Sequence, residues 1–164
     1  MDLKTNRQEL NKQAFIFGNL FLLANQLQVV CDQYLEKDHI TTKQWLLLAV
    51  ISQFKDTSPT LSEVSELIGC SRQNIKQLAL KLEKKEFLKI RKDEQDTRAY
   101  RLVLTEKCNF YWKSREDLDS KFITDILSCL TSEETNILSD CITKVLAKIN
   151  GIYECNSLDG RPIE

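Results

Sequence analysis

The hydrophobic period of the chain changes from helical to extended within one short region, and this change restricts the possible folds more than any other feature. Thr60 and Glu63 form a helix-capping pair, and the apolar residues after them recur at helical spacing. Gly69 can take a positive φ angle and so end that helix. Ser71 then caps a second segment with helical apolar spacing. Two short amphipathic helices around a glycine-containing turn predict a helix-turn-helix over residues 61–84.

A different pattern follows the second helix. Residues 87–91 and 100–104 alternate between apolar and charged or outward-facing side chains, and residues 92–99 between them are mostly polar. Period-two runs on both sides of a polar segment predict a β-hairpin with a long tip, over residues 87–104. A hairpin directly after a helix-turn-helix is the arrangement of a winged helix, which we expect over residues 37–104.

Four segments of this region resemble the MarR family of bacterial and archaeal transcription regulators. They are Thr41–Trp45 at the start of a helix, Ser71–Glu83 in the second helix of the helix-turn-helix, Asp96–Arg98 in the wing and Leu102–Thr105 after it. The wing signature, Asp-x-Arg followed by an apolar strand and Leu-Thr, is the most specific of the four. With the flanking helices, the resemblance covers roughly residues 8–150, nearly the whole chain.

The resemblance implies a mainly α-helical single domain over residues 1–164, with a small β-hairpin as the wing. It also implies that the helices within residues 8–36 and 105–150 interlock across a two-fold axis and form a homodimer. The first of these helices carries apolar side chains on more than one face, and such a helix needs more than one packing partner. A second copy of the chain would be one such partner.

The resemblance also implies a function. In the family, the second helix of the helix-turn-helix enters the major groove of a pseudo-palindromic operator, and an arginine of the wing enters the minor groove. Arg98 stands in the place of that arginine, and Asp96 stands in the place of the acid that holds its guanidinium. We therefore expect a sequence-specific transcription regulator of double-stranded DNA, acting as a repressor. The predicted DNA-binding residues are Ser71, Arg72, Gln73, Asn74, Lys76, Gln77, Lys81, Lys92, Asp96 and Arg98.

The distribution of charge supports this expectation. The chain has a net charge of −1, but residues 72–101 hold ten lysines and arginines against five acids, while the remainder holds 13 against 19. A basic unit on an acidic body is typical of DNA-binding proteins. The side-chain amide of Asn74 can bond adenine bidentately, and Arg72 could reach guanine.

Members of the resembled family often bind small aromatic molecules in a cleft between the dimerisation helices and the winged unit. The candidates to line such an effector cleft are Phe17, Phe21, Trp45 and Tyr111. Aromatic residues at helical spacing also form ordinary hydrophobic core, so the sequence leaves both interpretations open.

Six cysteines stand at positions 31, 70, 108, 129, 141 and 155, no two closer than twelve residues, and His39 is the single histidine. Zinc sites need clustered ligand pairs, so we expect no metal and no cofactor. Cys129 and Cys141 have helical core spacing and should be buried. Cys70 and Cys108 lie near helix starts, where a thiol pKa can fall, so a thiol-based redox regulator remains an alternative.

An enzyme has little support, because the chain lacks a glycine-rich phosphate loop and His39 alone cannot build a triad of the usual kind. The second alternative is a winged helix that binds proteins. Such a module would need neither Arg98 nor the polar side chains that open the second helix.

Two further expectations concern the ends of helices and the cell compartment. The resembled family usually has glycine after the recognition helix, where this chain has Glu86, so we expect a different helix end or mild strain there. The richest apolar run, residues 14–30, is interrupted by polar residues, and the charged residues 1–9 are unlike a signal peptide. We therefore expect no membrane-spanning segment and a cytoplasmic protein.

Overall fold

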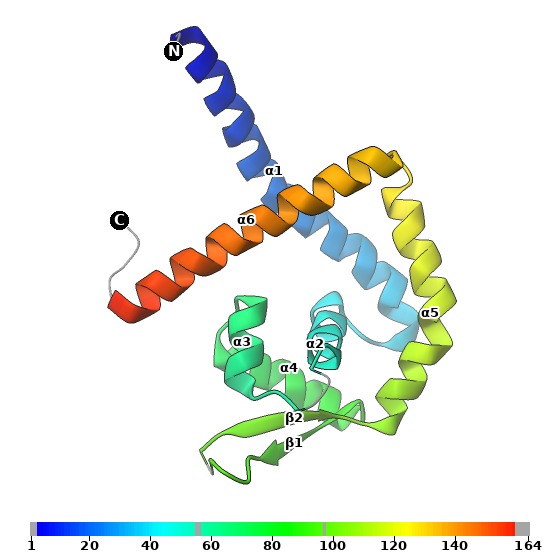
Figure 1. The fold of residues 1–164 in the computed structure, drawn as a ribbon. Coiled ribbons are helices and arrows are strands. Elements are labelled where there is room, and N and C mark those ends of the chain that lie inside the picture. The colour runs from blue at the N-terminus through cyan, green and yellow to red at the C-terminus, as the bar shows by residue number, and fades with distance from the viewer. Residues whose placement is uncertain (1–2, 55–56, 97, 160–164) are drawn as a thin grey trace. The chain divides into compact units, whose positions relative to one another are not determined.

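The computed structural model describes residues 3–54, 57–96 and 98–159 of the 164-residue chain. Within these residues it is mainly α-helical with one two-stranded antiparallel hairpin, which confirms the predicted fold class (Figure 1). The elements in chain order are α1 (Leu3–Leu35), the 3-10 turn η1 (Glu36–Asp38), α2 (Thr42–Ser52), α3 (Leu61–Ile68), α4 (Arg72–Lys84), β1 (Leu88–Lys92), β2 (Tyr100–Leu104), α5 (Glu106–Leu127) and α6 (Ser132–Asp159).

The starts of α2 and α3 are both capped by threonine, as the sequence predicted for α3. Thr41 and Thr60 each accept a hydrogen bond from the backbone N–H three residues on, and Gln44 and Glu63 bond back to complete the capping boxes. Gly69 ends α3 with a φ angle of 70°. Short polar side chains at these positions satisfy N–H groups that have no partner inside the helix.

The end of α6 differs from the sequence prediction, which closed this helix near residue 150. The helix continues through Gly151 to Asp159. A glycine ends a helix only where it adopts a positive φ, and within a helix it costs only about 1 kcal/mol relative to alanine. Composition alone could not distinguish these two uses of glycine.

The chain forms two compact units, residues 1–111 and residues 112–164. In the first unit, α2, α3, α4 and the hairpin enclose a hydrophobic core, and α1 contacts α2 and η1. Each of these enclosing elements except β1 contributes core side chains with no exposed surface; they are Leu47, Leu48, Val64, Ile75, Ala79, Leu82 and Leu102. In β1, Leu88 is almost fully buried.

The hairpin is joined to the segment that precedes α3. Its strands pair in the register Leu88 with Leu104 through Lys92 with Tyr100. Leu102 also donates its N–H to the carbonyl of Pro59 at 2.8 Å, and Thr60 forms a single bridge with Arg101. The wing is thus held directly to the start of the helix-turn-helix.

The apolar surface of α1 is mostly uncovered within the chain. Phe15, Phe17 and Phe21 keep between 61% and 69% of their surface exposed. By length and composition, Gln8–Asp38 also holds a window of mean hydropathy 1.6 that is apolar enough to cross a membrane, so the polar residues within 14–30 interrupt the apolar run less than expected. This is weak evidence, since helices that pack in a protein core and signal sequences have the same character.

Candidate nucleic-acid interface

The predicted recognition helix, α4, presents a polar surface. Ser71 caps it by accepting the N–H of Asn74 at 3.2 Å. Ile75, Ala79 and Leu82 are its buried residues and fix one face against the core. The predicted DNA-binding side chains of this helix and its cap are all exposed; they are Ser71, Arg72, Gln73, Asn74, Lys76, Gln77 and Lys81.

A hollow of about 440 Å³ lies between the starts of α3 and α4 and the wing. Arg72, Lys76 and Arg98 line it together with Asp96, although they come from distant parts of the sequence. The ammonium group of Lys76 lies 5.6 Å from the centre of the Tyr100 ring, a cation–π contact that fixes it beside the wing. The structure thus brings residues of the recognition helix and the wing to one site.

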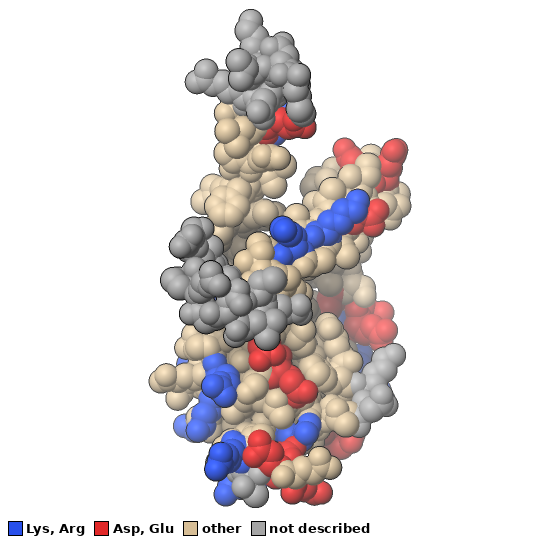
Figure 2. Space-filling view, turned by 60° about the vertical axis from the view of Figure 1, so that its left-hand side comes forward, with Lys and Arg blue, Asp and Glu red and all other residues tan. Residues whose placement is uncertain are grey.

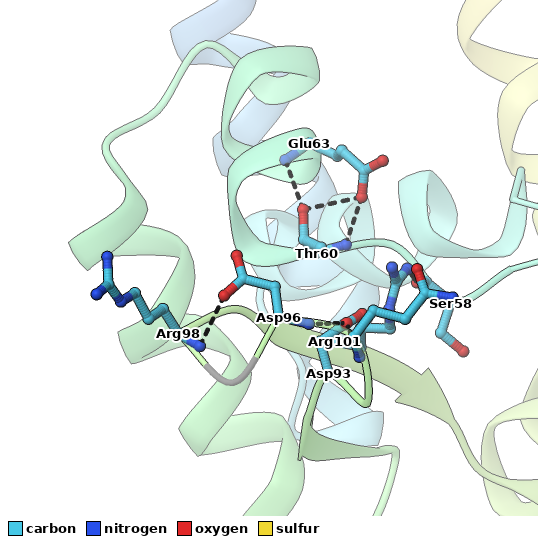
Figure 3. A network of polar contacts seen from close by, with 8 residues as sticks. Ser58, Thr60, Glu63, Asp93, Asp96, Arg98 and Arg101 are labelled. Carbon is cyan, nitrogen blue, oxygen red and sulfur yellow. Dashed lines mark hydrogen bonds and ion pairs between the residues drawn. The ribbon is translucent and has the colours of Figure 1, made fainter.

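Asp96 organises the wing differently from the sequence prediction. Its carboxylate accepts the backbone N–H of Arg98 at 2.9 Å, and the described residues include no ion pair between Asp96 and the Arg98 guanidinium (Figure 3). A carboxylate bonds readily to the N–H two residues on, which closes a local turn. Asp96 therefore fixes the backbone that carries Arg98, and the side chain of Arg98 extends away from it.

Sequence analysis missed Asp93, which is the best-buried carboxylate of the wing with 7% of its surface exposed. It accepts the N–H groups of Gln95 at 2.8 Å and Asp96 at 2.7 Å, and it forms an ion pair with Arg101. These contacts, the backbone N–H of Asp96 foremost, hold the pKa of Asp93 below its usual range. The sequence could have suggested this role, because an aspartate at the start of a polar loop often accepts the backbone N–H groups two and three residues on.

Two of the basic residues within 72–101, Arg101 and Lys85, make contacts inside the winged unit. Arg101 donates to the carbonyl of Ser58 at 2.6 Å in addition to its pair with Asp93. Lys85 donates to the carbonyl of His39 and lies 3.3 Å from Oε1 of Gln44. Lys92 is exposed, as predicted for a DNA-binding residue. In Figure 2, lysine and arginine side chains gather along one edge of the winged part, with acidic side chains beside them.

Glu86 takes the positive φ angle expected from its place after the recognition helix, with φ at 63°. The hydroxyl of Thr105 donates to its carbonyl at 2.6 Å, and Lys107 pairs with its carboxylate at 3.3 Å. A left-handed conformation costs a non-glycine residue about 1–2 kcal/mol, which the surrounding contacts must offset. His39 adopts the same conformation with φ at 55°, which the sequence did not predict.

None of the four predicted effector-cleft residues lines the hollow between the recognition helix and the wing. Phe17 and Phe21 pack edge to face on α1, with ring centres 5.3 Å apart. Tyr111 is buried and packs in the same way against Phe87 at 5.2 Å, and Trp45 is half-buried on α2. The structure thus pairs two of them with each other and uses Tyr111 in the core.

The cysteines divide differently from the prediction. Cys129 and Cys141 are exposed, although the apolar spacing on which they lie predicted burial. Cys108 is fully buried and Cys70 is exposed. Burial and the nearby Asp32 raise the pKa of the Cys31 thiol, which makes it less reactive. The described part of the chain contains no cluster of side chains suited to a metal ion.

Comparison with known proteins places the fold. No family model matches the sequence. The transcriptional activatory protein BadR of Rhodopseudomonas palustris is 24% identical over 99 residues, and the matched part is 60% of this chain and only 57% of BadR. The chain therefore spans little more than half of that relative.

Solved structures match over a greater length. A MarR-type regulator from Methanosarcina mazei Go1 superposes with a TM-score of 0.76 at 17% identity, over 85% of this chain and 99% of the other. A MarR/EmrR-family regulator from Acinetobacter sp. ADP1 gives 0.73 at 20% identity, over 85% and 97%. MepR of S. aureus, solved in complex with DNA, gives 0.70 at 22% identity, over 80% and 97%.

The fold and the site together define a winged helix-turn-helix protein. More particularly, the chain has the fold of the MarR-family transcriptional regulators, which confirms at the level of the fold the resemblance found in the sequence.

Proposed function

We propose that this protein is a sequence-specific regulator of transcription that binds double-stranded DNA as a homodimer of single-domain chains. The observation that carries the proposal is the meeting of Arg72, Lys76 and Arg98 around one hollow between the recognition helix and the wing. Basic side chains from two elements at one exposed site suit a phosphate backbone. The DNA complex of the structural neighbour MepR supports this choice of ligand.

The exposed surface of α4 suggests a division of roles. Gln73, Asn74 and Gln77 carry the amides that read adenine in a major groove, and Arg72 reaches guanine. Arg98 enters the adjacent minor groove. The remaining polar residues of the predicted set, Ser71, Lys76, Lys81 and Lys92, contact phosphates, and Asp96 fixes the wing backbone.

Dimerisation is proposed from uncovered apolar surface. In α1, Phe15, Phe17 and Phe21 are exposed, and in α6 the same holds for Ile137 and Leu146. Each helix by itself leaves more apolar surface in water than a stable monomer commonly does. Pairing with a second copy would cover it and would place two recognition helices on a pseudo-palindromic operator.

The direction of control and the signal are further parts of the proposal. A protein that only occupies its operator can block transcription without any further surface, so we propose that it acts as a repressor. We also propose that it works in the cytoplasm and is not an enzyme. BadR is named an activatory protein, so a reporter assay should be scored for both signs. A small aromatic effector that contacts Phe17, Phe21, Trp45 or Tyr111 would release the DNA.

The test is binding of a fluorescein-labelled, mixed-sequence 24-base-pair duplex, followed by anisotropy as the salt concentration rises. We expect retention at low salt and a linear loss of log affinity with log salt, and Arg98→Ala should weaken binding and flatten that slope by about one phosphate equivalent. Lys37→Ala removes the same charge from an exposed position of η1 and is the matched control. Binding by Arg98→Ala equal to that of the wild type would show that the wing does not engage DNA.

A further inference from the structure

A series of hydrogen bonds runs from the tip of the wing to the carbonyl of Ser58, in the segment before α3. The carboxylate of Asp96 accepts the N–H of Arg98 at 2.9 Å. The N–H of Asp96 in turn donates to Oδ1 of Asp93 at 2.7 Å, as the N–H of Gln95 does at 2.8 Å. The backbone that presents Arg98 is therefore fixed to one buried carboxylate.

The same carboxylate is joined to the segment before α3. Its second oxygen, Oδ2, pairs with Nε of Arg101, and Nη1 of Arg101 donates to the carbonyl of Ser58 at 2.6 Å (Figure 3). The side chain of Asp93 is 5% exposed and that of Arg101 is 35% exposed, so the carboxylate side of this ion pair is the one shielded from solvent. Two residues after Ser58, Thr60 begins the capping box of α3.

We propose that Asp93 and Arg101 are positioning residues that hold the wing tip in place for DNA binding, and that Arg101 makes no phosphate contact despite its charge. This inference rests on the proposed function. A wing held before binding loses less conformational freedom when DNA arrives, so the ordering cost that would reduce affinity is already met in the free protein.

The inference makes a prediction opposite in sign to that of charge alone. Asp93 and Glu94 are adjacent acids near a surface proposed to face DNA, so simple electrostatics predicts that neutralising either would strengthen binding. Glu94 is exposed, whereas Asp93 makes the contacts described above. Only loss of the positioning role would make neutralisation of Asp93 weaken binding.

The experiment compares Asp93→Asn with its matched control Glu94→Gln, on the same labelled 24-base-pair mixed-sequence duplex at several salt concentrations. Asparagine can still accept the two loop N–H groups but cannot form the ion pair. We expect Asp93→Asn to weaken binding by about fivefold or more with an unchanged salt slope, because the bound state keeps its phosphate contacts. Glu94→Gln should bind as well as the wild type or more tightly.

A second variant keeps the proposal testable if Asp93→Asn does not fold. Arg101→Met should also weaken binding without flattening the salt slope, and the double variant should bind no more weakly than either single variant. Equal behaviour of Asp93→Asn and Glu94→Gln would overturn the inference, as would a salt slope reduced by about one in Arg101→Met. Absence of binding by the wild type would instead refute the proposed function, and the inference with it.

Discussion

The winged unit and the long helix α1 differ in how much of their apolar surface is buried. In the winged unit, Leu48, Ile75 and Leu82 have no exposed surface, and the chain covers them by itself. In α1, Phe15 keeps 69% of its surface exposed and Phe17 keeps 67%. The winged unit thus buries its own apolar side chains, whereas α1 has the apolar composition of a core helix but leaves these side chains exposed.

This difference indicates where stability and function reside. A closed core fixes α4 and the wing rigidly, as a site for DNA needs. Uncovered apolar helices gain free energy only by association, so their contribution should depend on protein concentration.

The largest expected effect is in the closed core. Leu82→Ala removes a fully buried side chain of α4 and should lower the free energy of unfolding by about 2–5 kcal/mol, through lost burial and the cavity left behind. Leu67→Ala is the matched control, since Leu67 of α3 is 62% exposed. Urea unfolding measures both, and similar losses in the two variants would contradict the distinction between covered and uncovered leucines.

The second prediction concerns the uncovered surface of α1. Replacing Phe17 or Phe21 with Ser should shift the protein toward the monomer, since each ring buried against a partner contributes about 1.5–3 kcal/mol. The same change should leave the thermal unfolding of the winged unit at low protein concentration nearly unaltered. Light scattering checks the first effect, with Lys12→Ser, an exposed polar position of α1, as control. An unchanged dimer in both phenylalanine variants would place the interface elsewhere.

The third prediction sharpens the account of the winged unit. On an operator obtained by selection from genomic DNA, Asn74→Ala or Gln77→Ala should reduce discrimination between operator variants by about 1–3 kcal/mol per lost contact. Binding to mixed-sequence duplex should change little, because it depends on charge. Competition anisotropy separates the two, and equal weakening on both duplexes would reduce these residues to phosphate contacts.

The smallest expected effect is a dependence of stability on pH. Hydrogen bonds from the backbone N–H and the hydroxyl of Thr60 lower the pKa of Glu63. The same two groups of Thr131 lower the pKa of Glu134. A carboxyl with a lowered pKa in the folded state stabilises above its unfolded pKa, and this stabilisation disappears as the pH falls through the folded value. Stability should therefore fall as the pH drops below about 5, where glutamate carboxyl groups of the unfolded chain begin to protonate.

Glu63→Gln provides the control for this dependence. Glutamine can keep the capping box but does not titrate. The variant should unfold with a shallower pH dependence between about pH 5 and 3 than the wild type. An identical pH profile for this variant would show that Glu63 contributes nothing to it.

Most of the local structure could be predicted from sequence because its causes are local. The capping pairs of Thr41, Thr60 and Thr131, the φ angle of Gly69 and the period of the hairpin all depend on residues a few positions apart. The exposed residues of α4 followed from the same spacing.

What the sequence did not reveal depends on distant partners. The role of Asp93 requires Arg101 and the carbonyl of Ser58, which only the folded wing brings together. Cys129 and Cys141 are exposed on their own unit, and the period of the apolar residues alone cannot distinguish an exposed apolar face from a covered one.

The central claim is that two winged units bind DNA together because the exposed apolar faces of the long helices pair. Sedimentation equilibrium of the protein, alone and with a labelled mixed-sequence duplex at low salt, tests this claim most directly. The account predicts a free protein of twice 19.1 kDa and a complex that contains two chains for each occupied site. A free protein of 19.1 kDa at micromolar concentration, or a complex with one chain for each site, would contradict it.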